Sequence, residues 1–278
     1  MNTEQRAAVL SGALSALGVR ALLMGGHAVR FYGVDRSTVD YDFCVALDRP
    51  AWDALSSLLR RSNVIGHELF REGPSWRPEA FRRFVVGVLP DGREERLEFW
   101  RENHLLAPFD DLYARRTDGL YGGHRLGVLG LDDLIRSKET EREDDWRDVN
   151  LLEEIADERR LAAAVTPDDR SHALAALRSR RGFEYVLSQG LLADEAAVGV
   201  AWRVATHPIS GAFLLPSVAA GTGALDAHSA LAPMIGALRA VTPGSPRHLA
   251  LVEAVRRLYR REAMAADRAD KERYGSRQ

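Results

Sequence analysis

The stretch LMGGHAVRFYGVDRSTVDYDF, residues 23–43, decides the fold and the chemistry that we expect for this chain. It ends in Asp40 and Asp42, two carboxylates separated by one residue. Residues i and i+2 of a strand point to the same face, and like charges held this close need a cation or a proton to neutralise them. The free N–H groups of a Gly25-Gly26 turn before a helix favour an anion. Together these features predict a site for Mg²⁺ and a nucleotide triphosphate.

Less specific interpretations of the same residues remain open. An Asp-x-Asp motif alone is weak, and Asp40 and Asp42 could be ordinary exposed strand residues. The glycine pair could simply allow a helix to pack closely on a strand. The Gly-Gly turn at this distance before the two aspartates favours the site.

Secondary structure can be predicted around this stretch from hydrophobic spacing and turn residues. We expect, in chain order, a buried strand over 20–26, a short helix over 26–33, a strand over 38–47, a helix from Pro50, a hairpin over 82–100 turning at Asp91-Gly92, a short strand over 125–130, and helices over 131–143 and 144–160. This pattern predicts an α/β (α+β) fold with a small mixed sheet.

A third carboxylate is available in the second strand of the predicted hairpin. Glu98 lies between Leu97 and Phe99, and a carboxylate inside an apolar strand needs a partner. Two-metal phosphoryl transfer requires several carboxylates that converge on two Mg²⁺ ions. Glu98 together with the two aspartates supplies them, whereas the alternative is that Glu98 pairs with an arginine such as Arg96.

Cationic side chains suited to a triphosphate also occur. Arg36 precedes the aspartates and can bind a phosphate through two hydrogen bonds. Lys138 is one of only two lysines in a chain rich in arginine, and we expect it in mid-helix, where its compact charge reaches the triphosphate. Asp145 and Asp148 lie on one helical face and would position Lys138 or Arg142, or be ordinary surface acids.

Composition narrows the class of protein. The chain has 278 residues, a net charge of -2 and one cysteine, so no global field draws it to nucleic acid and no intrachain disulfide forms. No apolar run approaches the length of a membrane span. We therefore expect a cytoplasmic protein without a membrane partner. From about residue 160, Ala, Leu and Arg dominate with helical periodicity, which predicts a catalytic domain over 1–160 and a mainly helical region over 161–278.

The quoted residues resemble the minimal nucleotidyltransferases of the DNA polymerase β superfamily, in the branch of AbiEii-like and related bacterial proteins. The resemblance covers residues of about 20 to 155 and rests on three segments: GGHAVRFYG, RSTVDYDF and LDDLIRSKETEREDDWRDV. It places the family's pattern on Gly25, Gly26, Arg36, Thr38, Asp40, Asp42, Glu98, Lys138, Arg142, Asp145 and Asp148. In the family the third carboxylate is usually Asp, and the residue at Asp144 is often Lys.

The resemblance implies transfer of a nucleoside monophosphate from an NTP to an acceptor hydroxyl, with release of pyrophosphate. Asp40, Asp42 and Glu98 would be catalytic and metal-binding, and the glycines, Arg36, Lys138 and the two later aspartates would bind the nucleotide. The implied acceptors are tRNA ends for toxin-like members, which would have an antitoxin partner, or proteins and small molecules. Two alternatives remain: an aminoglycoside-type antibiotic nucleotidyltransferase, and a catalytically silent nucleotide-binding module.

Overall fold

The computed structural model describes residues 2–61, 70–75, 77–175, 177–189 and 245–275. The chain divides into two compact units. Unit 1 contains Met1–Lys138 with Asp270–Gln278, and unit 2 contains Glu139–Ala269. The domain division expected near residue 160 lies inside the long helix α7 (Glu143–Ala163). No helix in the described part of the chain is long and apolar enough to cross a membrane.

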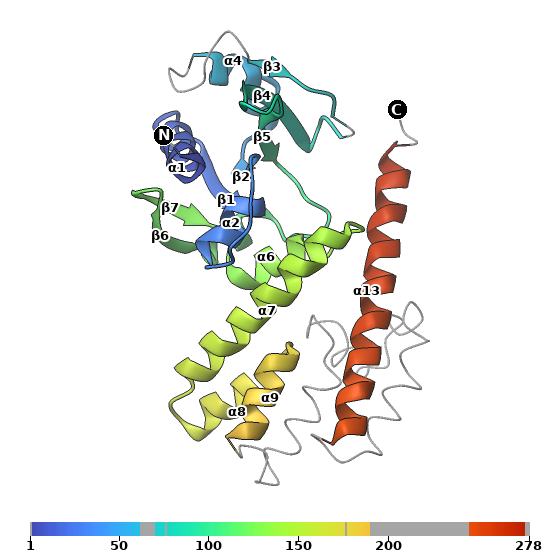
Figure 1. The fold of residues 1–278 in the computed structure, drawn as a ribbon. Coiled ribbons are helices and arrows are strands. Elements are labelled where there is room, and N and C mark those ends of the chain that lie inside the picture. The colour runs from blue at the N-terminus through green and yellow to red at the C-terminus, as the bar shows by residue number, and fades with distance from the viewer. Residues whose placement is uncertain (1, 62–69, 76, 176, 190–244, 276–278) are drawn as a thin grey trace. The chain divides into compact units, whose positions relative to one another are not determined.

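Unit 1 is built on a seven-stranded sheet with the order β3-β4-β5-β2-β1-β7-β6 (Figure 1). The central pairs β2–β5 and β1–β7 are parallel and the other pairs are antiparallel. The strands are β1 (Arg20–Met24), β2 (Tyr41–Ala46), β3 (Arg71–Glu72), β4 (Phe81–Val88), β5 (Glu94–Trp100), β6 (Thr117–Tyr121) and β7 (His124–Val128). This mixed sheet with helices confirms the predicted α/β fold class.

Strands β1 and β2 are mostly apolar, and most of their residues are buried. The fully buried side chains include Leu22, Leu23, Tyr41, Phe43, Phe84, Leu97 and Phe99. Asp42 and Glu98 therefore lie on strands that hold the core, and a rigid core fixes the direction in which their side chains point.

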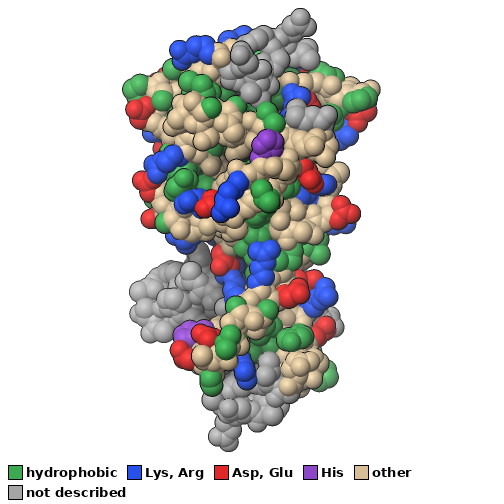
Figure 2. Space-filling view, turned by 90° about the vertical axis from the view of Figure 1, so that its left-hand side faces the viewer, with side chains coloured by type: hydrophobic (Ala, Val, Ile, Leu, Met, Phe, Trp, Pro, Cys, Tyr) green, Lys and Arg blue, Asp and Glu red, His purple; other side chains and the backbone are tan. Residues whose placement is uncertain are grey.

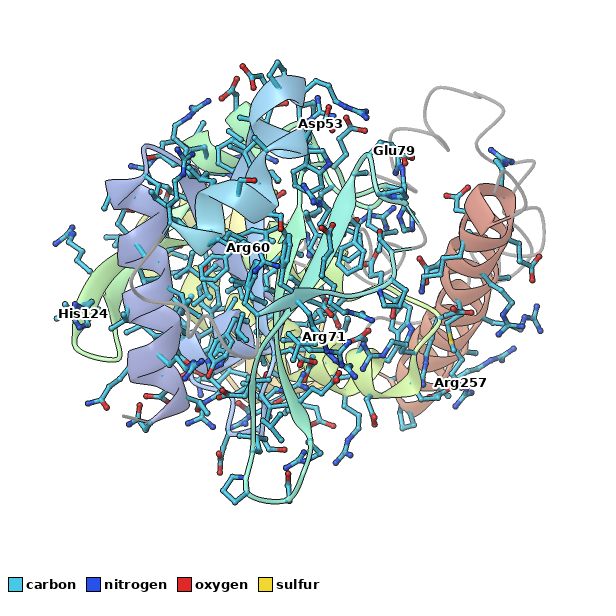
Figure 3. The ribbon with its side chains drawn as sticks, turned by 90° about the horizontal axis from the view of Figure 1, so that it is seen from above. Asp53, Arg60, Arg71, Glu79, His124 and Arg257 are labelled. Atoms are coloured by element: carbon cyan, nitrogen blue, oxygen red, sulfur yellow. The ribbon has the colours of Figure 1, made fainter. Side chains whose placement is uncertain are left out.

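The helices of unit 1 pack on this sheet. They are α1 (Thr3–Ala16), α2 (Gly25–Phe31), α3 (Arg49–Asp53), α4 (Leu55–Arg60), α5 (Phe109–Ala114) and α6 (Leu131–Ser137). Helix α1 contacts β1 and β7, α2 contacts β1, β2 and α6, and α5 contacts β2. Figure 3 shows α1 beside the hairpin of β6 and β7, on which the labelled His124 lies. Strands β3 and β6, which we did not predict, are both edge strands of the sheet.

Three expected boundaries differ from the structure. Strand β2 begins at Tyr41, so Asp40 lies just outside it. The predicted two-residue hairpin turn is longer: Gly92 N–H donates to the Leu89 carbonyl, and Gly92 has a φ of 84°. Helix α6 ends at Ser137, so Lys138 is its C-cap and not a mid-helix residue. The Lys138 N–H bonds the Ile135 carbonyl, three residues back, which tightens the last turn and ends the helix.

Unit 2 is helical in its described residues. It contains α7 (Glu143–Ala163), α8 (Pro167–Ala175), α9 (Arg180–Ser188) and α13 (Pro246–Gly275), whose last residues from Asp270 onward are grouped with unit 1. The buried Asp157 carboxylate accepts bonds from the N–H groups of Arg178 and Ser179 and from the Ser179 hydroxyl, which joins α7 to the start of α9. The Gly- and Pro-rich stretch 206–228 lies outside the described residues.

Candidate functional site

Two strand registers place the carboxylates of Asp42 and Glu98 side by side. Met24, the last residue of β1, is opposite Asp42 on β2, and Asp42 is opposite Glu98 on β5. Residues opposite each other on neighbouring strands share a face of the sheet. The two side chains therefore meet at the point where β1 ends and the Gly25 turn begins.

The Asp42 carboxyl is in an unfavourable place for a charge. Burial first, and then the neighbouring Glu98 carboxylate, hold the pKa of Asp42 well above its ordinary value, while the Lys138 ammonium acts in the opposite direction. Asp40 adds a smaller repulsion, and Glu98 forms a hydrogen bond with Asp42. Two carboxyl groups held this close repel each other when both are ionised, and this repulsion helps to keep the pKa of Asp42 high.

Glu98 also has a cationic partner, which is Arg83 and not the Arg96 that we considered. The Arg83 Nε atom donates to Glu98 Oε1 at 2.6 Å, and the two residues are opposite each other on β4 and β5. The Arg96 guanidinium bonds Glu94 instead, at 3.4 Å. Glu98 therefore lies between a carboxyl group on β2 and a guanidinium group on β4.

Gly25 and Gly26 are required at their positions by close contacts. Gly25 has a φ of 62°, and a Cβ atom there would lie 1.9 Å from Asp42 Oδ2. A Cβ atom on Gly26 would lie 2.4 Å from the Thr38 Oγ1 atom. Any side chain on Gly25 would displace the Asp42 carboxylate. The turn thus brings backbone into direct contact with the Asp42 carboxylate.

Lys138 reaches the same carboxylate from another element. Its side chain is almost fully buried at the C-terminal end of α6, and α6 packs against α2. The Lys138 ammonium is close enough to Asp42 to lower the pKa of that carboxyl. The structure thus brings Gly25, Asp42, Glu98 and Lys138 together in unit 1, with Asp40 nearby.

The other predicted nucleotide-binding residues are placed differently. The half-buried Arg36 donates from its Nε atom to the Ser37 carbonyl at 3.3 Å. Asp145 and Asp148 are buried in the first two turns of α7, in unit 2. Asp145 accepts a bond from the Thr140 hydroxyl at 2.6 Å. Their roles toward a nucleotide stay predictions.

The donor set can be compared with the needs of Mg²⁺. Among the described residues, no group of three or more His, Cys, Asp or Glu side chains is arranged to hold a metal ion. Mg²⁺ usually takes one or two carboxylates from a protein and completes its octahedron with waters and substrate phosphates. The adjoining carboxylates of Asp42 and Glu98 fit that requirement, because a divalent cation would offset the repulsion that raises the pKa of Asp42.

His27, which we expected to be a packing or capping residue, is fully buried beside this turn. Its ring stacks on Tyr41 with centroids 5.1 Å apart, and its Nδ1 atom lies 2.8 Å from the Tyr121 hydroxyl. Burial, and then the charge of Arg30, lower the pKa of His27 to about 4. Sequence reasoning missed Tyr121 and Arg83, because both reach this site through contacts between distant segments. Pairing of β4 with β5 places Arg83 opposite Glu98, and the Tyr121 side chain contacts His27 of α2.

Comparisons with known proteins come only from solved structures, since no family model and no curated protein matches the chain. An antigenic nucleotidyltransferase-like protein from Paracoccidioides brasiliensis is 19% identical and covers 70% of this chain and 92% of its own, with a TM-score of 0.38. JHP933 from Helicobacter pylori is 16% identical and covers 73% of this chain and 89% of its own, with a TM-score of 0.38. What this chain does therefore has to follow from its own side chains.

Proposed function

We propose that this protein is a Mg²⁺-dependent nucleotidyltransferase that moves a nucleoside monophosphate from an NTP to an acceptor hydroxyl. The observation that carries the proposal is the meeting of Asp42, Glu98 and Lys138 beside the Gly25 turn. Hard carboxylate oxygens, an ammonium group and the backbone N–H groups of a glycine turn are three kinds of group that bind a metal triphosphate. Each kind comes from a different element, so only the fold assembles them.

Each residue has a proposed role. Asp40, Asp42 and Glu98 would hold the two Mg²⁺ ions, which would supply charge stabilisation and an acidified acceptor hydroxyl. Gly25, Gly26 and Lys138 would bind the triphosphate, with Arg36, Asp145 and Asp148 as further nucleotide-binding residues. The acceptor oxygen would form a bond to the α-phosphorus of the NTP. The bond between that phosphorus and the oxygen that bridges the α- and β-phosphates would break. Pyrophosphate would leave, and the hydroxyl proton would pass to a carboxylate oxygen of the Asp42–Glu98 pair.

The acceptor is proposed on the resemblance alone. A tRNA end is our first choice, which would make the protein a cytoplasmic toxin with an antitoxin partner. A cationic antibiotic is the second choice, and proteins are a third.

One observation favours a second function, that of a nucleotide-binding module without turnover. The Arg83 guanidinium already neutralises Glu98, and this weakens Glu98 as a metal ligand and as a base.

The experiment separates these functions directly. The full chain is incubated with each labelled NTP, Mg²⁺ and one of three acceptor pools: total tRNA, protein or aminoglycosides. Label transferred to one pool, with pyrophosphate released, identifies the transferase and its acceptor class. Metal-dependent NTP binding without pyrophosphate release identifies the silent module. Absence of both would remove the proposal.

A further inference from the structure

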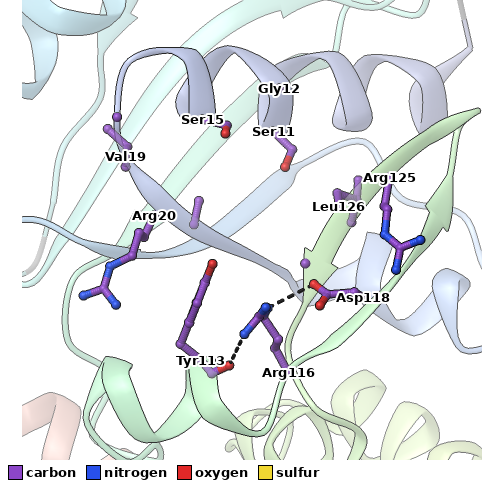
Figure 4. A pocket seen from close by; sticks show the side chains of 13 residues that line it. Ser11, Gly12, Ser15, Val19, Arg20, Tyr113, Arg116, Asp118, Arg125 and Leu126 are labelled. Atoms are coloured by element: carbon purple, nitrogen blue, oxygen red, sulfur yellow. Dashed lines mark hydrogen bonds and ion pairs between the residues drawn. The ribbon is translucent and has the colours of Figure 1, made fainter.

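A polar cleft of about 560 Å³ lies in unit 1, at the opposite end of β1 from the residue that pairs with Asp42. Its walls come from the second half of α1, the start of β1, the residues around the end of α5, and the hairpin of β6 and β7 (Figure 4). Arg20 lines this cleft, whereas Met24 at the far end of the same strand pairs with Asp42. Four residue steps of strand span about 13 Å. The cleft is therefore separate from the proposed transfer site.

The lining of this cleft is cationic and rich in hydroxyl groups. Three guanidinium groups line it with one carboxylate, and the hydroxyls of two serines and a tyrosine add hydrogen-bonding atoms: Arg20, Arg116, Arg125, Asp118, Ser11, Ser15 and Tyr113. Pockets for neutral small molecules have mostly apolar walls, whereas this one has few apolar side chains. Its chemistry suits an anion.

Arg116 is held in position at the floor of the cleft. Its Nε atom bonds Asp118 at 3.0 Å, its Nη1 atom bonds the Tyr113 carbonyl at 2.8 Å, and its guanidinium stacks over the Tyr113 ring at 4.0 Å (Figure 4). A guanidinium that is already oriented loses little conformational entropy when it binds a ligand. Arg116 thus presents a prepared donor surface to the cleft.

The other two arginines are available to a ligand in different ways. Arg20 pairs with Asp110 at 2.8 Å, but both side chains are more than half exposed, and an exposed ion pair contributes little. The side chain of Arg125, an exposed residue of β7, makes no hydrogen bond or ion pair with another residue that the structure describes. Positive and negative side chains are mixed over the face drawn in Figure 2, whereas three arginines and one aspartate line this cleft.

We propose that this cleft is a second anion site, which binds the phosphate group of a phosphorylated ligand. Arg20, Arg116 and Arg125 would donate to the phosphate oxygens, since the planar guanidinium fork matches phosphate geometry. The phosphate belongs to a small phosphate ester or to an RNA backbone. Because no residue of the proposed transfer site lines the cleft, binding here is independent of that activity.

The test uses the full chain with EDTA, so that no divalent cation attracts phosphate to the carboxylates of the transfer site. Inorganic phosphate is titrated and followed by NMR shifts of arginine side chains. We expect saturable binding, a Kd raised about ten-fold or more in Arg125→Ala, and no change in Asp42→Asn. Loss of NTP transfer in Asp42→Asn would support the proposed function and would say nothing about the anion site, because Asp42 does not line the cleft.

Gly12 offers a matched pair of variants. It is an exposed helical residue that lines the cleft, and a Cβ atom there would meet no heavy atom within 4 Å. Gly12→Glu should abolish phosphate binding, because it places a negative charge and extra volume in the cleft. Gly12→Ala should bind as the natural chain does. Both variants should fold, since α1 gains a better helix former.

The remaining arms identify the source of the phosphate. A nucleoside monophosphate and a short single-stranded RNA are titrated under the same conditions. Tighter binding of the RNA assigns an RNA backbone, and equal or weaker binding of the RNA assigns a small phosphate ester. The proposal is overturned if phosphate does not bind saturably, or if binding is unchanged in both Arg125→Ala and Gly12→Glu.

Discussion

Asp42 is pressed against a second carboxyl group, Glu98, by the parallel register of β2 and β5. We expect Asp42→Asn to abolish Mg²⁺-dependent NTP transfer while Tm stays unchanged or rises, because the change removes one charge from a repelling pair. Pyrophosphate release and thermal unfolding measure the two effects. Asp53→Asn is the control, since Asp53 is an exposed partner of Arg49 and is not among the groups that shift the pKa of Asp42. Full activity in Asp42→Asn would exclude the proposed metal site.

Lys138 is a buried cation whose charge lowers the pKa of Asp42. Lys138→Ala should weaken NTP use severely, and Lys138→Arg should restore it only in part, because a planar fork is bulkier than a point charge. Nucleotide titrations and turnover of the two variants check this. Arg49→Ala, at an exposed arginine of α3, is the control. A Lys138→Ala protein with normal affinity and turnover would leave this residue without a role.

Arg83 tests whether Glu98 depends on its ion pair. Arg83→Ala should lower the free energy of unfolding by about 1–2 kcal/mol, because it leaves a mostly buried carboxylate without its partner. Arg96→Ala, on the same strand as Glu98, should cost about 0–1 kcal/mol, since its partner Glu94 is more exposed. Urea unfolding compares the two variants. Equal losses of unfolding free energy in the two variants would mean that the Arg83–Glu98 pair stabilises the fold no more than the exposed Arg96–Glu94 pair.

At the scale of elements, the turn from β1 into α2 leaves space for the Asp42 carboxylate only because residue 25 is a glycine. Gly25→Ala should destabilise the fold by more than the roughly 1–2 kcal/mol expected for a left-handed residue, because its Cβ would also displace the Asp42 carboxylate. Gly92→Ala has a positive φ as well, but meets no atom within 4 Å, so only the backbone cost applies. Thermal unfolding of both variants separates strain from collision. Equal losses would contradict the close contact at Gly25.

At the scale of the whole molecule, the buried His27 makes stability depend on pH. Burial first and then the charge of Arg30 lower its pKa to about 4; Glu4 acts in the opposite direction, and Arg36 adds a smaller lowering. A histidine in the unfolded chain has a pKa of about 6.5, so the unfolded state binds the proton more tightly between these values. Stability is therefore complete above about pH 6.5 and falls until about pH 4, by up to roughly 3 kcal/mol.

The measurement is urea unfolding at a series of pH values, compared between the natural chain and His27→Phe. Between about pH 6.5 and pH 4 the natural chain should lose up to roughly 3 kcal/mol more stability than His27→Phe, because the other groups titrate equally in both. His124→Phe, at an exposed histidine of the β6–β7 hairpin, should leave the profile unchanged. A parallel decline in all three proteins would show that His27 does not titrate as described.

The sequence was sufficient for the local features of unit 1. Residues 20–26 and 38–47 contain β1 and β2, residues 26–33 contain most of α2, and the hairpin around Asp91-Gly92 is present. These elements follow from hydrophobic spacing and from glycine, both of which act within a few residues. The end of α6 at Ser137 was not predicted, because 131–143 continues a helical pattern and only the local backbone geometry stops it.

The sequence by itself determined which chemical groups are available. These are two aspartates separated by one residue, a glycine pair, a glutamate within a strand and one lysine before the long helix. What the tertiary structure decided is which of these groups meet. The β2–β5 register joined Asp42 to Glu98, the β4–β5 register gave Glu98 the Arg83 partner, and the packing of α6 brought in Lys138. A register depends on pairing between distant segments, and a one-residue slip would send each side chain to the opposite face.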